Sequence, residues 1–203
     1  YTEQTVFMTP KDFQDIENMP NLKSLSKENA ISLINTKAYQ MNNEYSSNMS
    51  IGSGTRGNAT SYTARFADIN EKEKQIYHLR TNEVLGKGKF VNTDIAALKE
   101  LNKKNNYMPY VGALGDSLKE KEIDIYTFGN SDIEERSISF GSLITMDSNG
   151  IVQNGIIDNS INILSDKYPF GMKTDYEVLM SNIDGINNGL IVLELGDLYS
   201  LDK

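Results

Sequence analysis

Four segments of the chain carry apolar residues at the three- and four-residue spacing of an amphipathic helix. One face of such a helix packs on a core, and the opposite face meets water. The spacing predicts helices over residues 21–29, 93–105, 111–123 and 175–183, and residues 11–19 fit a shorter one. We expect Asn21, Thr93 and Thr174 to cap three of these helices, because short polar side chains accept hydrogen bonds from the first backbone N–H groups.

Five other segments are short apolar runs bounded by turn residues, which is typical of β-strands. They cover residues 5–9, 30–36, 124–132, 139–147 and 189–197. The turn sequence SNG at 148–150 predicts a hairpin in which 151–157 pairs with the strand before it. The run LIVLEL at 190–195 predicts a strand that is buried on both faces.

Strands that alternate with helices predict an α/β fold, with a mostly parallel sheet flanked by helices. We expect residues 1–203 to form a single α/β domain, within which the polar stretch 70–92 is an insertion. The chain ends shortly after what the pattern predicts to be a central strand. We therefore expect it to be an incomplete part of a larger domain.

Composition excludes several classes of function. The net charge of −8 and the scattered lysines argue against nucleic acid as a partner, because phosphate backbones are usually held by a basic face. The chain has no cysteine and a single histidine, His78, so a metal site would depend mainly on carboxylates. No apolar run approaches the roughly 20 residues of a membrane span. The starting residue Tyr1 indicates a processing or cloning boundary.

The stretch SIGSGTRGNATS at 50–61 contains Gly52-x-Gly54-x-x-Gly57, which has the spacing of a dinucleotide-binding fingerprint. A working fingerprint follows an apolar strand and opens a helix. The preceding residues, NNEYSSNMS, are polar, so we expect these glycines to serve positive φ angles and close packing in a loop. A nucleotide-binding domain is a weaker hypothesis.

Four further residues have alternative interpretations. The alternation in IYHLR favours a partly buried, hydrogen-bonded His78 over a ligand. Asp132 and Asp147 follow strands, where we expect them to cap turns. Asp197 follows the last apolar strand, and open α/β sheets bind ligands at this end of a strand, so it is a candidate site residue.

The order of several segments resembles the alkaline phosphatase superfamily. VFMTPKDFQDI, MPNLKSL and AISLINT are similar to its opening strand, helix and second strand, and SIGSGTRG is similar to the Asn-Ile-Gly-Ala-Gly-Arg segment of cofactor-independent phosphoglycerate mutases. GALGDSLKEKEIDIYTFGNSD resembles a helix–strand unit of the same fold. SLITMDSNGIVQNG and LIVLELGDLYSLD resemble poorly characterised bacterial alkaline-phosphatase-like proteins, some of which are extracytoplasmic or membrane-linked.

The resemblance implies a set of site residues. The superfamily's first metal-binding acid falls near the neutral Thr9, and the nearest acid is Asp12; Asp197 matches a later metal-binding acid. The nucleophile is a hydroxyl at a helix N-terminus. Alignment on Ile51 puts Glu44 at that position, so the candidates are nearby hydroxyls, with an anion-binding arginine beside one of them. They are Ser46, Ser47 and Thr55, with Arg56.

By this resemblance, the chain is the N-terminal part of a metal-dependent phosphoryl or sulfuryl hydrolase or transferase. Its divalent zinc, manganese or magnesium ions would act on a small anionic substrate. We expect Ser46, Ser47, Thr55 and Asp197 to converge on one rim of the sheet. The neutral Thr9 favours an alternative, a degenerate and non-catalytic binding or structural module. In both cases we expect an extracytoplasmic location in a bacterium.

Overall fold

The computed structural model describes residues 17–18, 20–28, 38–40, 43–132 and 137–197. The chain divides into two compact units, residues 1–36 and 37–203. In the first unit, the described residues form helix α2 (Pro20–Glu28), which confirms the expected helix. Asn21 lies inside its first turn and therefore does not cap it. The strands expected over 5–9 and 30–36, and nearly all of the helix expected over 11–19, lie outside the described residues.

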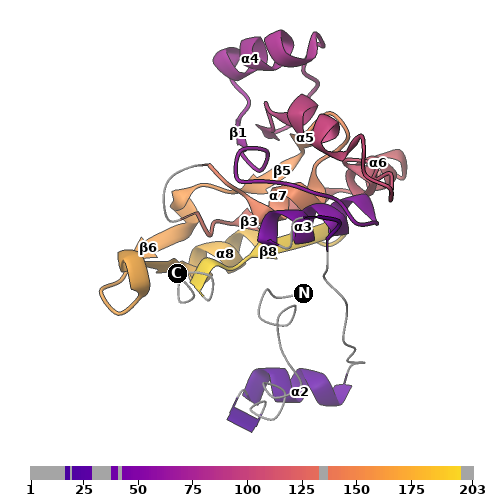
Figure 1. The fold of residues 1–203 in the computed structure, drawn as a ribbon. Helices are drawn as coiled ribbons and strands as arrows, with labels where there is room; N and C mark the ends of the chain where they lie inside the picture. Colours follow the sequence, from indigo (N-terminus) through magenta and orange to yellow (C-terminus); the bar gives the residue numbers. More distant parts are fainter. Residues whose placement is uncertain (1–16, 19, 29–37, 41–42, 133–136, 198–203) are drawn as a thin grey trace. The chain divides into compact units, whose positions relative to one another are not determined.

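A three-stranded parallel sheet forms the centre of the second unit (Figure 1), which confirms part of the expected architecture. Its order is β5 (Asn154–Ile156), β3 (Ile125–Gly129) and β8 (Leu190–Glu194). Among the described strands, β8 pairs with β3 alone, and most of its side chains are half-buried. Within the described part of the chain, β8 is therefore not buried on both faces, and that expectation is wrong.

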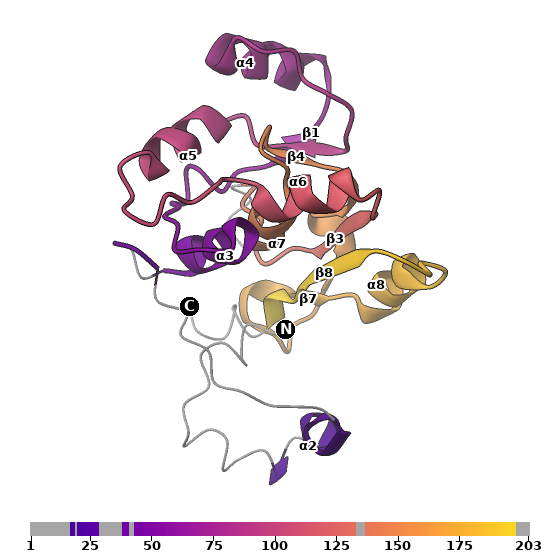
Figure 2. The same cartoon turned by 90° about the vertical axis from the view of Figure 1, so that its right-hand side faces the viewer.

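Helices cover one face of this sheet. Helix α7 (Phe140–Thr145) packs against β3 and β8, and helix α3 (Glu44–Ser53) packs against α7 (Figure 2). Helix α6 (Ala113–Glu120) contacts both helices. The prediction of a strand over 139–147 is wrong, because every residue of α7 is buried and such a segment has no polar face to show a helical period. Ser139 caps α7 by accepting a hydrogen bond from the Ser142 N–H.

Helix α8 (Tyr176–Ile183) covers the opposite face of the sheet, where a small core joins Phe128, Ile161 and Leu179. Its cap is Asp175, whose side chain accepts from the backbone N–H groups of the two residues that follow Tyr176. Thr174 instead ends strand β7 (Met172–Thr174), so the prediction of a Thr174 cap is wrong. Strand β7 pairs with β6 (Asn162–Leu164); one short 3₁₀ turn precedes β6, and a second lies in the connection between β6 and β7. They are η2 (Asn159–Ile161) and η3 (Pro169–Gly171).

A second, antiparallel sheet has the order β1 (Ala67–Asp68), β2 (Phe90–Val91) and β4 (Ile151–Val152). The hairpin expected at 148–150 is therefore wrong, because β4 pairs with β2 and the following β5 joins the parallel sheet. The sheets of the described residues are thus mixed rather than mostly parallel. The main core gathers large side chains from this sheet and the helices around it. Its fully buried members include Met49, Phe90, Leu98, Leu143 and Met146.

Two helices come from the polar middle of the chain. Helix α5 (Ile95–Asn102) follows Asp94 rather than Thr93 directly, so Thr93 does not cap it. Helix α4 (Glu71–Thr81) lies within the stretch 70–92 and projects from the rest of the unit (Figure 1). Tyr77 is its buried residue.

In the part of the chain that the structure describes, every helix is too short or too polar to cross a membrane.

Candidate functional site

The three parallel strands end at the same edge of their sheet, and polar segments follow each of them. Asn130, Ser131 and Asp132 follow β3, Asp158 and Asn159 follow β5, and Asp197 follows β8. Ligands of open α/β sheets bind outside these carboxyl ends of the strands. This carboxyl edge is therefore the first place to look for a functional site.

Glu194, the last residue of β8, is buried at this edge. Its Oε1 accepts hydrogen bonds from the Ser131 N–H (3.2 Å) and from the Ser131 hydroxyl. Its Oε2 accepts from the Gly141 N–H (2.8 Å) and lies 3.2 Å from the Ser139 hydroxyl. Burial raises the pKa of Glu194, and these hydrogen bonds oppose that effect. With its acceptors occupied, this carboxylate joins β8 to the loop after β3 and to the start of α7.

A cleft of about 370 Å³ opens at the carboxyl ends of β3 and β5. The volume is in the range of small-molecule sites. Three buried apolar side chains form part of the lining: Phe66, Phe90 and Ile157. The polar lining consists mainly of carboxylates and amides. These residues are Asp68, Asn70, Asn130, Asp132, Asp158 and Asn159, with Ser137.

Hydrogen bonds hold part of this polar lining in place. The Asn130 Nδ2 donates to Asn159 Oδ1 (2.8 Å), which ties the end of β3 to η2. Asn130 Oδ1 accepts from the Asp132 N–H (2.8 Å), and Asp132 Oδ2 accepts from the Ile138 N–H (3.1 Å). Asp132 therefore organises the backbone of its own loop, as expected. These hydrogen bonds fix the positions of the Asn130, Asp132 and Asn159 side chains.

Two carboxylates that line the cleft have oxygen atoms without a hydrogen-bond partner among the described residues. Asp158 Oδ1 accepts from the Ser160 N–H (2.8 Å) and hydroxyl, whereas its Oδ2 has no hydrogen-bond partner among the described residues. The Asp68 side chain also lacks a hydrogen bond or ion pair within the described part of the chain, and both residues are exposed. These oxygens are free to accept hydrogen bonds from a ligand.

The predicted nucleophiles Ser46 and Ser47 lie in the first turn of α3, after its cap Asn43. The Ser46 hydroxyl is buried, donates to the Ala59 carbonyl (3.1 Å) and accepts from the Ala59 N–H (3.0 Å). The Ser47 hydroxyl donates to the Asn43 carbonyl (3.0 Å). Both hydroxyls therefore hold backbone groups in place, and Ser46 fastens the 57–60 segment to α3.

Thr55 and Arg56 follow the other end of α3. At 1.5 Å per residue, the length of the helix separates them from Ser46 by about 10 Å along its axis. Arg56 Nη1 donates to the Tyr107 hydroxyl (3.1 Å), and its guanidinium lies 5.2 Å from the centre of the same ring. The predicted hydroxyls of Ser46 and Ser47 thus lie at one end of the helix, and Thr55 and the predicted anion-binding Arg56 lie at the other.

Asp197 makes contacts elsewhere in the fold. Its Oδ1 accepts from the Thr174 N–H (2.7 Å) and its Oδ2 from the Tyr176 hydroxyl (2.9 Å). Burial and this hydrogen bond raise the pKa of Tyr176 to about 12. The described partners of Asp197 come from β7 and α8, whereas those of Ser46 and Ser47 come from α3 and the 57–60 segment.

The described residues do not by themselves form a divalent metal site. Among them, no three His, Asp or Glu side chains gather where they could hold a metal ion. Asp12 lies outside the described residues. His78 is exposed on α4, and its Nδ1 lies 3.1 Å from the Glu83 carbonyl, so it is hydrogen-bonded as expected but not partly buried.

The glycine fingerprint has a structural explanation. It ends helix α3, with Gly54 as a left-handed cap at φ 67°, whereas a dinucleotide fingerprint opens a helix. Gly52 packs against the backbone of Leu143 and Ile144 in α7, where a Cβ atom would lie 2.4 Å from the Leu143 carbonyl oxygen. The geometry therefore favours a helix end and a close helix contact over a pyrophosphate site.

Sequence reasoning missed Glu194, Asn130 and Ser131. One signal was present: a single acid ends the apolar run LIVLE, and the polar stretch GNSD follows the apolar strand IYTF. An acid at the end of a parallel strand is positioned like Asp197, which is a candidate by the same rule. The residues of the GNSD stretch are common in turns, and a turn is a sufficient explanation for them. The sequence therefore does not predict that Asn130 and Asp132 line a cleft.

We expect Ser46→Ala to lower the free energy of unfolding by about 1 kcal/mol, because the buried Ala59 N–H and carbonyl lose their hydrogen-bond partner. Urea unfolding followed by circular dichroism measures the effect. Ser117→Ala is the matched control, since its exposed hydroxyl donates only to a helix carbonyl. Equal losses in the two variants would contradict a structural role for Ser46.

A scan of protein-family models, a search of curated proteins and a search of solved structures each returned no significant match for this chain.

Proposed function

We propose that this chain is an extracytoplasmic binding module of a bacterium, whose ligand lies in the cleft at the carboxyl edge of the parallel sheet. The observation that carries the proposal is the cleft itself, at the ends of β3 and β5 and lined by fixed amide and carboxylate groups. The hydroxyls considered for catalysis, Ser46 and Ser47, hold backbone groups instead, which favours binding over covalent chemistry.

The lining indicates the chemistry of the ligand. Ionised carboxylates only accept hydrogen bonds, and three of the lining residues are aspartates. The free Asp158 Oδ2 and the Asp68 carboxylate therefore favour a ligand that donates hydrogen bonds and carries positive charge. We propose a small polyhydroxylated amine, such as an amino sugar, for which hydroxyl and ammonium groups match these acceptors.

The test is an NMR titration of the ¹⁵N-labelled chain with glucosamine, with glucose as the neutral comparison. We expect glucosamine to shift the amide resonances of Asn130, Asp158 and Asn159, and to bind more tightly than glucose. Asp158→Asn should weaken glucosamine binding about fivefold, because a charge-assisted hydrogen bond becomes a neutral one.

Asp184→Asn is the matched control. It removes the same charge from an exposed side chain at the end of α8, which does not line the cleft. Absence of shifts at the cleft, or an equal loss of affinity in both variants, would overturn the proposal.

Metal-dependent phosphoryl or sulfuryl transfer is the second candidate, and the resemblance to the alkaline phosphatase superfamily supports it. The placement of Asp197 after a parallel strand is the structural observation in its favour. Thermal melting with zinc, manganese or magnesium discriminates the two candidates, because a metal that binds only the folded chain raises the midpoint. A metal-induced rise, together with hydrolysis of p-nitrophenyl phosphate, would favour the enzyme.

A further inference from the structure

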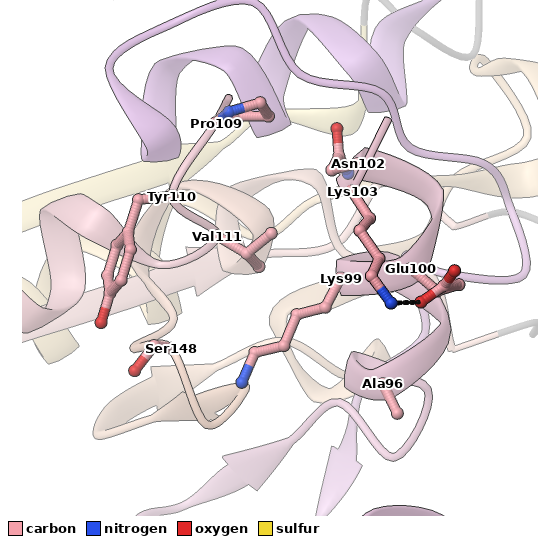
Figure 3. A pocket seen from close by; sticks show the side chains of 9 residues that line it. All are labelled: Ala96, Lys99, Glu100, Asn102, Lys103, Pro109, Tyr110, Val111 and Ser148. Carbon is pink, nitrogen blue, oxygen red and sulfur yellow. Dashed lines mark hydrogen bonds and ion pairs between the residues drawn. The ribbon is translucent and has the colours of Figure 1, made fainter. Parts of the chain in front are cut away.

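A second hollow lies away from the carboxyl edge, between helix α5 and the loop that follows it (Figure 3). Its volume is about 550 Å³. The α5 side of the hollow carries charged residues, and the loop side is largely apolar. The lining residues are Ala96, Lys99, Glu100, Asn102, Lys103, Pro109, Tyr110, Val111 and Ser148.

The loop wall of this hollow is held in one conformation. Buried Asn105 donates from Nδ2 to the Arg56 carbonyl (2.8 Å), and its Oδ1 accepts from the Tyr107 N–H (2.9 Å). Met108 adopts a positive φ of 48°, which is rare for a residue with a side chain. Such a conformation persists only where its surroundings fix it. The loop therefore presents its exposed side chains without a large ordering cost.

Asp116 fixes the far wall. Its Oδ2 accepts from the Tyr110 hydroxyl (2.8 Å), and its Oδ1 accepts from the Ser148 N–H (3.1 Å). Burial opposes ionisation of Asp116, but these hydrogen bonds and the charge of Lys119 lower its pKa overall. The Tyr110 ring and the turn at Ser148 are thus positioned together, as two sides of the hollow.

Two lysines supply the charge. Lys99 and Lys103 are four residues apart on α5, so they share one face of the helix. Lys103 pairs with Glu100 at 3.3 Å, whereas Lys99 has no hydrogen bond or ion pair within the part of the chain that the structure describes. In Figure 3 the Lys99 side chain extends across the hollow toward Ser148. The exposed Lys99 ammonium is therefore available to pair with an anionic ligand.

We propose that this hollow binds a small amphiphilic anion, with a carboxylate or phosphate group on an aromatic or aliphatic body. The anionic group lies between Lys99 and Lys103, and the body lies against the Tyr110 ring, Pro109 and Val111. A wall that is already ordered reduces the entropic cost of binding. The proposal is independent of the carboxyl-edge cleft, whose carboxylates favour a cation.

The test uses four probes on the ¹⁵N-labelled chain at constant ionic strength: phenyl phosphate, phenylacetate, inorganic phosphate and benzyl alcohol. We expect both amphiphilic anions to shift the amide resonances of Lys99, Tyr110 and Val111. They should bind about tenfold more tightly than inorganic phosphate, which lacks the apolar body, or benzyl alcohol, which lacks the charge.

Lys99→Gln should weaken binding of phenyl phosphate and phenylacetate about tenfold. Lys87→Gln is the matched control, because Lys87 is an exposed lysine between α4 and β2 that does not line the hollow. Both substitutions are at exposed positions, and a melting curve checks that each variant is folded. Shifts confined to other residues, or equal weakening by the two variants, would overturn the proposal, as would tight binding of inorganic phosphate alone.

Discussion

Glu194→Ala is expected to lower the free energy of unfolding by about 3 kcal/mol or more. The substitution leaves the buried Ser131 and Gly141 N–H groups without their acceptor and opens a cavity between β8, β3 and α7. Each buried donor without a partner costs free energy because it had hydrogen bonds to water in the unfolded chain. Urea unfolding of both proteins, with the slopes compared to check two-state behaviour, measures the loss.

Glu194→Gln separates shape from charge in this cluster. Burial raises the pKa of Glu194 in the folded chain above its ordinary value of 4.5. A raised folded pKa means that the folded chain binds more protons, so the stability from this group is present below the unfolded pKa and is lost as pH rises through the folded pKa. We therefore expect the stability of the natural chain relative to the Gln variant to fall between about pH 4 and the folded pKa. A pH-independent difference would show that the surrounding donors fully compensate for burial.

The elements that sequence predicted well are those with a clear amphipathic face. Helices α5, α6 and α8 and strand β3 form where the pattern indicated. Each helix buries one face and leaves the other at least partly exposed, whereas β3 is a short apolar run that is mostly buried. Helix α7, where the pattern predicted a strand, is buried all round, and a run of buried residues carries no period to distinguish a helix from a strand. Cap positions also differed, because several polar residues near each helix start could satisfy the same backbone N–H groups.

The candidate site was only partly predictable, for a different reason. The rule that ligands bind at the carboxyl ends of parallel strands pointed to the edge of the sheet at which the cleft opens. It did not identify Glu194, whose hydrogen-bond partners lie 53 to 63 residues away along the chain. The Asn130–Asn159 hydrogen bond likewise joins two loops whose proximity depends on the pairing of β3 with β5. Local patterns do not contain such long-range neighbours.

Gly52→Ala is the second substitution with a large expected effect. The new Cβ atom would lie 2.4 Å from the Leu143 carbonyl oxygen and 2.9 Å from that of Ile144, so α3 and α7 would have to move apart. Overpacking against backbone costs about 3 kcal/mol at the upper end of the usual range. For a chain of this size, the melting midpoint should fall by about 6–12 °C, measured by circular dichroism or calorimetry.

Gly54→Ala is the control within the same glycine pattern. A Cβ atom at Gly54 meets nothing within 4 Å, so its cost comes only from the positive φ of 67° and amounts to about 1 kcal/mol. The two positions therefore require glycine for different reasons. Gly54 is needed for its backbone conformation, and Gly52 is needed for the close approach of two helices. Equal losses in the two variants would mean that the α3–α7 contact can relax, and the close-packing explanation of Gly52 would then be wrong. A larger loss at Gly52 would assign the spacing Gly-x-Gly-x-x-Gly in this chain to the packing of α3 on α7 and to the end of α3.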